Sequence, residues 1–163
     1  MTANEFKTWK TIHLGTGPKT PGDFREALKD NEINLNHWAN DILGQPAFTV
    51  ATKETEIDLV KVTLAKLGFE NDTNRDQICE RAKELGLELC PAEVGPQLRL
   101  QYQDQPNDEW VLIGMEPIPN SDGNPNVFGM VYLVSELWFF STWGFSNRVW
   151  SDVFQWVFCL PRK

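Results

Sequence analysis

The sequence is poor in the residues on which most catalytic and metal sites depend. It has 2 histidines and 3 cysteines in 163 residues. Neither His13 nor His37 stands near a serine or cysteine in the kind of motif that nucleophilic catalysis requires. Cys79, Cys90 and Cys159 are too far apart for a CxxC metal site and too few for a disulfide framework. We therefore expect three small buried apolar side chains in a reducing compartment, and we predict no catalytic residue, no metal and no cofactor.

Long apolar runs and runs of basic charge are also missing. No stretch approaches the ~20 apolar residues that span a bilayer, and no N-terminal signal sequence is visible. Lys and Arg number 15 against 23 Asp and Glu, which gives a formal net charge of -8. Nucleic acids and anionic membranes both attract basic surfaces, so this balance disfavours both as partners. These features predict a cytoplasmic protein.

The chain is rich in tryptophan and phenylalanine, and they are concentrated over 137–163. Four of its seven tryptophans lie there, namely Trp138, Trp143, Trp150 and Trp156, and five phenylalanines are interleaved with them. The run 156–160 is apolar at every position, which indicates a strand covered on both faces. Segment 139–154 instead mixes aromatic with small polar residues and has no period of two or of 3.6. Such a mixture is more typical of a recognition surface than of a packed element. The alternative is a β-hairpin with an irregular, partly exposed turn.

Capping residues and apolar spacing predict helices over 21–30, 34–43 and 74–85. Thr20 and Asp23 have the spacing of a capping box, and Asn34 can cap the second helix. The first two helices could form a DNA-reading helix-turn-helix, but the second carries no basic residues on its polar face. We therefore interpret the pair as an αα-hairpin packed on a sheet.

Alternating apolar residues or short continuous apolar runs predict strands over 9–14, 47–51, 57–64, 98–102, 110–115, 127–134 and 156–160. We expect 98–102 and 110–115 to pair as an antiparallel hairpin. A helix running to Leu67 also fits the pattern after Ile57, but the Val, Thr and Ile content favours a strand. The prediction is one α+β domain that spans 1–163. Its first part, 1–90, is expected to be rich in helices, and these helices pack on a largely antiparallel sheet formed by the β-rich part, 96–163. The expected core includes Trp38, Leu43, Ile78, Leu85, Leu98, Leu100, Val131, Trp156 and Phe158.

Acidic residues keep a second function class open. The oxygen-bearing side chains of 120–124 have the alternate spacing that hard cations favour, but the Asp-Gly pair there is a strong turn signal. A turn is therefore the preferred interpretation. Asp58, Glu93 and Glu116 could converge in the fold, so the alternative function is a small enzyme or metal-binding protein that uses acidic residues.

The C-terminal stretch resembles the variable region of diversity-generating retroelement target proteins. In that family, mutation at template adenines randomises chosen codons, and those codons do not become Lys, Glu, Gln, Met or Trp. Between Trp138 and Trp156, setting aside Trp143 and Trp150, only Gln155 lies outside the reachable set. The resemblance covers this stretch alone. It implies a C-type-lectin-like fold, although the chain ends in Trp-Val-Phe-Cys-Leu-Pro-Arg rather than in the family's Gly-Phe-Arg-like motif.

The resemblance also implies a function: a non-enzymatic display protein that binds a protein or another macromolecule. Tryptophans would form the fixed framework, and the residues between them would be the diversified positions. The expected ligand-binding residues are Phe139, Phe140, Thr142, Trp143, Phe145, Ser146, Asn147, Arg148, Ser151, Asp152 and Phe154. Apart from Trp143, these are expected to be mostly solvent-accessible on one side of the protein. The anchors expected underneath are Trp138, Trp150 and Trp156.

Overall fold

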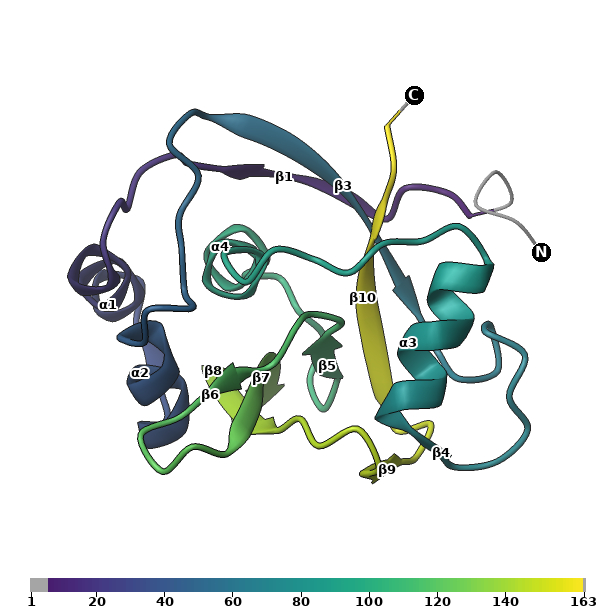
Figure 1. Ribbon diagram of the computed structural model, residues 1–163. Helices are drawn as coiled ribbons and strands as arrows, with labels where there is room; N and C mark the ends of the chain where they lie inside the picture. The colour runs from purple at the N-terminus through teal and green to yellow at the C-terminus, as the bar shows by residue number, and fades with distance from the viewer. Residues whose placement is uncertain (1–5, 163) are drawn as a thin grey trace.

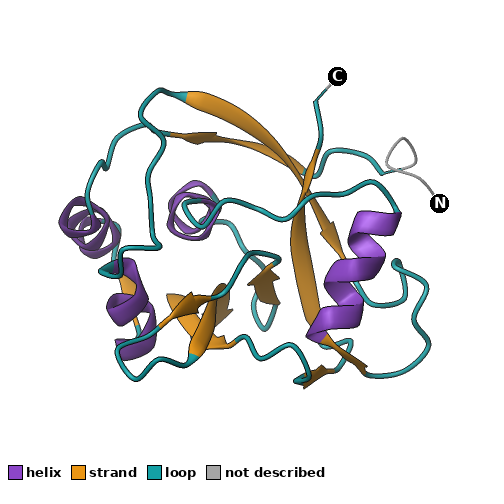
Figure 2. Cartoon of the chain, in the orientation of Figure 1, coloured by secondary structure: helices purple, strands orange, loops and turns teal. Residues whose placement is uncertain are grey.

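The computed structural model describes residues 6–162, and one curled β-sheet organises its backbone (Figure 1). The helices within these residues are α1 (Pro21–Asp30), α2 (His37–Leu43), α3 (Arg75–Glu84) and α4 (Val94–Gln101). None of them is long and apolar enough to cross a membrane. The strands of the sheet are β1 (Lys10–Leu14), β2 (Ile33–Leu35), β3 (Thr55–Val62), β5 (Trp110–Ile113), β6 (Ile118–Pro119), β7 (Pro125–Leu133), β8 (Glu136–Trp143) and β10 (Phe154–Leu160). A separate two-stranded ribbon contains β4 (Thr73–Asn74) and β9 (Val149–Trp150), as Figure 2 shows near the lower edge of the molecule.

The strands of the sheet follow the order β1-β3-β10-β5-β7-β8-β2, with β6 paired to β7. Neighbouring strands are antiparallel except for β10 with β5 and β2 with β8, which are parallel. The prediction of an α+β fold with a largely antiparallel sheet is confirmed. The sheet takes β1, β2 and β3 from the part of the chain that was expected to be mainly helical. The two parts of the chain therefore share one sheet instead of forming separate layers.

Alternation along the central strands sends side chains to two separate cores. On β10, Val157 packs in the core that contains α1, α2 and α4, whereas Trp156 and Phe158 pack in the core that contains α3. The same alternation separates Leu59 from Val60 on β3. Figure 1 shows α4 inside the curl of the sheet and α3 on the outer side of β10. We call these two sides the concave and the convex face.

Helix α4 occupies 98–101, where a strand was predicted, so that prediction is wrong. Gln101 lies in one helical stripe with Gln97 and Glu93, spaced by four residues, and this stripe binds the backbone of β1 and of the residues that follow it. Gln101 Nε2 donates to the His13 carbonyl (2.9 Å), and the His13 N–H donates to Gln101 Oε1 (2.9 Å). The Gly15 N–H donates to Glu93 Oε2 (2.7 Å). Because this edge needs hydrogen-bond partners, the polar positions are fixed by the sheet and not by solvent.

On its other side, α4 holds the opposite part of the curl through Arg99, which is fully buried. Arg99 Nη1 donates to the carbonyls of Trp138 (3.1 Å) and Val131 (3.4 Å), which face each other across β7 and β8. Nη1 also donates to Gln105 Oε1 (2.7 Å). Burial lowers the pKa of Arg99 to about 10, and the guanidinium remains charged at neutral pH. Since 98–101 is helical, β5 pairs with β7 and β10 and not with the predicted hairpin partner.

Two further boundaries differ from the prediction. Residues 47–51 form a loop and not a strand, and the Ala51 N–H donates to the buried Glu93 carboxylate (2.8 Å). The second helix starts at His37 because residues 33–35 pair with β8 as β2. Asn36, and not Asn34, caps this helix, since Asn36 Oδ1 accepts from the Ala39 N–H (2.8 Å).

Most of the predicted core is buried. Leu43, Ile78, Leu85, Leu98, Val131, Trp156 and Phe158 are buried, which confirms those predictions. Trp38 and Leu100 are only half-buried, so the prediction is wrong for these two, although Leu100 packs against the concave core. The three cysteines are buried free thiols, as expected.

The first prediction concerns the convex core. Trp156 is fully buried and packs against Trp150 edge-on (5.8 Å between ring centroids) and against Phe158 in a stacked arrangement (6.4 Å). Trp156→Ala should lower the free energy of unfolding by about 3–5 kcal/mol, because it leaves a cavity in a packed core. Trp143→Ala is the matched control: this tryptophan is 52% exposed. The free energy of unfolding of this variant, measured in urea, should fall by less than about 1 kcal/mol. Equal losses in the two variants would contradict the assigned burial.

Candidate functional site

Helix α3 packs over only part of the convex face, and the remainder carries large aromatic side chains. The strand register places Trp138 of β8, Val131 of β7, Trp110 of β5 and Phe154 of β10 in one row. Trp138, Trp110 and Phe154 are all half-buried, whereas Trp156, two residues after Phe154 on β10, is fully buried. Large rings on a sheet face that no helix buries are unusual for a packed element.

These rings surround a cavity of ≈ 390 Å³, which we call the aromatic pocket. This volume lies within the range of ~300–1,000 Å³ that is common for ligand sites. Aromatic and aliphatic side chains form most of its lining: Trp110, Trp138, Phe140, Trp150, Phe154, Val131 and Leu133. Its polar lining residues are Asn36, Ser141, Thr142 and Arg148.

The walls of the pocket brace one another through edge-to-face ring contacts. Trp110 contacts Phe140 (5.7 Å between centroids) and Phe154 (6.1 Å). Trp150 contacts Phe154 at 4.9 Å. The Phe140 ring lies directly on the backbone of Gly129, where an added Cβ would come within 2.5 Å of the ring. Glycine at this position thus lets the ring lie flat against the sheet.

Arg148 lies at the rim of the pocket. Its guanidinium carbon is 4.1 Å from the centroid of the Trp150 ring, a cation–π contact. Nη1 donates to Thr142 Oγ1 (3.0 Å) and to the Trp143 carbonyl (3.4 Å). Partial burial lowers the pKa of Arg148. Among the salt bridges of residues 6–162 none involves Arg148, so the pocket has a cation without an anionic partner in the described chain.

Segment 143–153, which connects β8 to β10, is held in place by its backbone. Its β9 residues pair with β4, which leads directly into α3. The Arg75 N–H donates to the Arg148 carbonyl (2.9 Å), and the Asp76 N–H donates to the Ser146 carbonyl (2.9 Å). These N–H groups belong to the first turn of α3, where no partner exists within the helix. Because these bonds use main-chain atoms, they do not depend on the identity of the exposed side chains that the segment carries, whereas its buried Trp150 packs in the convex core.

Segment 143–153 is also where exposed apolar side chains collect. Of five exposed large hydrophobic residues in the described chain, four lie in it: Trp143, Phe145, Val149 and Val153. Trp143 and Phe145 contact each other edge-to-face (6.0 Å). Scattered exposed apolar residues are normal, whereas such a concentration is typical of interaction surfaces.

The expected ligand-binding residues fall into three groups. Four line the aromatic pocket: Phe140, Thr142, Arg148 and Phe154. Six more belong to segment 143–153 but do not line the pocket. Ser151 is half-buried, and the other five are exposed: Trp143, Phe145, Ser146, Asn147 and Asp152. The eleventh, Phe139, belongs to neither group.

The expected exposure of Phe139 is wrong. Its side chain is fully buried and stacks on Phe128 in the concave core (4.8 Å between centroids). The reason is that β8 is a regular strand, so Phe139 points away from the face that carries Trp138 and Phe140. Trp138 was expected to be an anchor underneath, but it is a half-buried wall of the pocket. Trp150 and Trp156 are buried, as predicted.

Sequence reasoning missed Trp110 and the role of α3. Trp110 lies on β5 and reaches the site only because β5 pairs with β10 and β7. The capping pattern at 73–76 did predict the start of α3, but local sequence does not specify that carbonyls of 146–148 accept its first N–H groups. Both contributions depend on long-range pairing.

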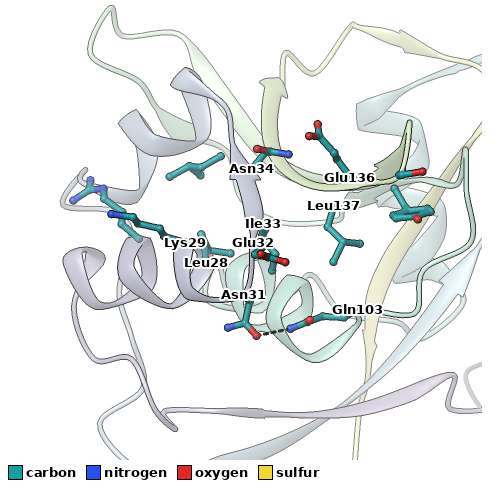
Figure 3. Close-up of a pocket in the computed structure, with 13 residues that line it drawn as sticks. Leu28, Lys29, Asn31, Glu32, Ile33, Asn34, Gln103, Glu136 and Leu137 are labelled. Carbon is teal, nitrogen blue, oxygen red and sulfur yellow. Dashed lines mark hydrogen bonds between the residues drawn. The ribbon is translucent and has the colours of Figure 1, made fainter.

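A larger cavity of ≈ 840 Å³ lies beside β2, between α1 and the β7–β8 turn (Figure 3). Its labelled residues include Lys29 and Glu136 of opposite charge, and Gln103 Nε2 donates to Asn31 Oδ1 (3.0 Å) across it. The lining is mainly polar side chains and backbone. We place the candidate site in the smaller pocket, because its lining is mostly aromatic and aliphatic with few polar groups, as is usual for ligand sites, whereas polar groups make up more than half of the larger cavity's lining.

The carboxylates that were considered for an enzyme have separate partners. Asp58 accepts hydrogen bonds from Arg162 (2.9 Å) and Thr11 (2.6 Å), which lower its pKa. Glu93 accepts from the backbone of Gly15 and Ala51, and Glu116 is exposed. Asp58 and Glu93 thus serve different parts of the fold.

The 120–124 segment forms the predicted turn. Asn120 Oδ1 accepts from the N–H groups of Asp122 (2.9 Å) and Asn124 (3.0 Å), so its side-chain oxygen is used by the backbone. Within residues 6–162, no group of three or more His, Cys, Asp or Glu side chains is placed to hold a metal ion.

Comparison of the chain with protein-family models, curated proteins and solved structures gives no match. The resemblance to diversity-generating retroelement target proteins, and the C-type-lectin-like fold that it implies, therefore stay predictions.

The second prediction separates the two kinds of phenylalanine. Phe139→Ser should lower the free energy of unfolding by about 3–5 kcal/mol or more, because it removes a buried ring and buries a hydroxyl. Phe145→Ser, at a position that is 38% exposed, should cost less than about 1 kcal/mol. Thermal unfolding followed by circular dichroism would measure both. A Phe145→Ser variant as unstable as Phe139→Ser would show that segment 143–153 is part of the core.

Proposed function

We propose that this protein is a non-enzymatic binding protein that recognises a protein partner through the aromatic pocket and segment 143–153. The observation that carries the proposal is the open aromatic row Trp138, Trp110 and Phe154, adjoining four exposed apolar residues on a backbone-anchored segment. Burying apolar surface is worth roughly 25 cal/mol per Å², so an open face of this kind favours association.

The arrangement matches the way in which protein interfaces are built. Affinity is concentrated in a few aromatic and arginine residues near the centre, surrounded by a polar rim. Here the aromatic pocket and Arg148 would be the centre, and Ser146, Asn147 and Asp152 would belong to the rim. Tryptophan walls that brace one another lose little conformational entropy when a partner binds.

Backbone anchoring also supports the variable surface that the resemblance implies. Side chains at Phe145, Ser146, Asn147 and Asp152 are exposed, so replacing them leaves the main-chain bonds to α3 intact. We propose that these four positions are the diversified ones. Phe139, Phe140 and Phe154 would then be framework, because they are buried or form pocket walls.

The third prediction tests whether the pocket accepts a partner's aromatic side chain. Indole and p-cresol are the neutral analogues of the Trp and Tyr side chains. In a two-dimensional NMR titration of isotope-labelled protein, both should shift the indole N–H signals of Trp110 and Trp138. Saturation is expected in about the millimolar range, as for other very small ligands.

Two variants provide the comparison. Trp138→Ser removes a wall of the pocket and should abolish saturable binding. Trp38→Ser removes a half-buried tryptophan that lies outside the pocket, on α2, and should leave binding unchanged. If the shifts are absent, or survive in Trp138→Ser, the aromatic pocket is not a recognition site.

A further inference from the structure

We infer that the partner inserts an aromatic side chain that is flanked by a carboxylate, with the ring in the aromatic pocket and the carboxylate on Arg148. The inference rests on the proposed function and specifies the partner's chemistry. It is drawn from the position of one cation among the aromatic walls.

Arg148 retains donors for such a carboxylate. A guanidinium has five N–H donors, and both hydrogen bonds of Arg148 to described residues use Nη1. The Nε and Nη2 groups therefore have no acceptor in the described chain. Arginine pairs with carboxylates through two parallel hydrogen bonds, and these are stronger when the site is partly desolvated. Arg148 is half-buried and rests on the Trp150 ring, so its orientation is already restricted.

The pocket itself excludes the other common guest of an aromatic cage. Cages of this kind often bind cations over the ring faces. Here no Asp or Glu lines the pocket, and Arg148 would repel a second positive charge. A neutral aromatic group would gain apolar burial alone, whereas an aromatic group next to a carboxylate would gain burial and an ion pair.

The net charge of -8 does not overrule this local preference. At physiological ionic strength the Debye length is about 8 Å, so distant acidic residues are largely screened. Asp152, the acidic residue of segment 143–153, is exposed, and it makes no salt bridge to Arg148. A ligand carboxylate at the rim of the pocket would therefore mainly experience the positive charge of the Arg148 guanidinium.

The fourth prediction uses matched peptides. Acetyl-Gly-Phe-Asp-Gly-amide carries the ring and the carboxylate, acetyl-Gly-Phe-Asn-Gly-amide replaces the carboxylate by an amide, and acetyl-Gly-Ala-Asp-Gly-amide lacks the ring. NMR titrations of the wild-type protein should give a Kd for the Phe-Asp peptide at least about tenfold lower than for the Phe-Asn peptide, as for hydrogen bonds to charged groups. The Ala-Asp peptide should not saturate.

Arg148→Gln should remove the difference between the Phe-Asp and Phe-Asn peptides. Arg162→Gln is the matched control, because Arg162 pairs with Asp58 and Glu56 away from the pocket, and it should preserve the difference. The wild-type comparison of the two peptides does not depend on the folding of any variant. Equal affinities, or no binding of either peptide, would overturn the inference. The indole and p-cresol titration decides separately whether the proposed function stands.

Discussion

The fold depends on the way in which α4 fills the curl of the sheet and satisfies polar groups at both ends of it. On one side Gln101 binds the backbone of β1 and Glu93 binds the N–H of Gly15 just after it, and on the other side Arg99 binds the carbonyls of Val131 and Trp138. Gly95 lets α4 approach β7 closely, since an added Cβ would lie 2.5 Å from the Phe128 ring. Buried polar groups without hydrogen-bond partners are costly, so the position of the helix and the positions of the two parts of the sheet that it binds depend on one another. These contacts hold α4 between the two parts of the curl.

This curvature decides which face of the sheet remains open. The concave face is filled by α4, and α1 and α2 complete the core around it. On the convex face, α3 packs over β3 and the C-terminal part of β10, and the aromatic row of Trp138 on β8, Trp110 on β5 and Phe154 at the start of β10 is only half-buried. Helix α3 has a second role, because its first N–H groups hold the carbonyls of Ser146 and Arg148. One helix therefore completes the convex core and fixes the segment beside the pocket. The surface that we propose for recognition is thus a consequence of how the core is closed.

Local signals predicted the parts of the structure that local interactions determine. The helices α1 and α3 have strong caps, and Asn74 Oδ1 accepts from the Gln77 N–H at 2.8 Å. The stretch 98–102 misled because Leu98, Leu100 and Tyr102 alternate as in a strand, while Gln101 pairs with β1 only in the folded protein. For the site, the density of aromatic residues correctly directed attention to the C-terminal stretch. It could not assign Phe139 to the concave core or bring Trp110 into the pocket, since both depend on strand pairing over long distances in the sequence.

The central claim is that the aromatic pocket and Arg148 together recognise one ligand. Intermolecular nuclear Overhauser effects between the protein and an isotope-labelled Phe-Asp peptide would test it most directly. The account predicts contacts from the phenylalanine ring to Trp110 and Trp138, and from the aspartate methylene to Arg148. Contacts to the polar cavity beside β2, at Arg25 and Lys29, would contradict it, because the ligand would then be held without the aromatic row.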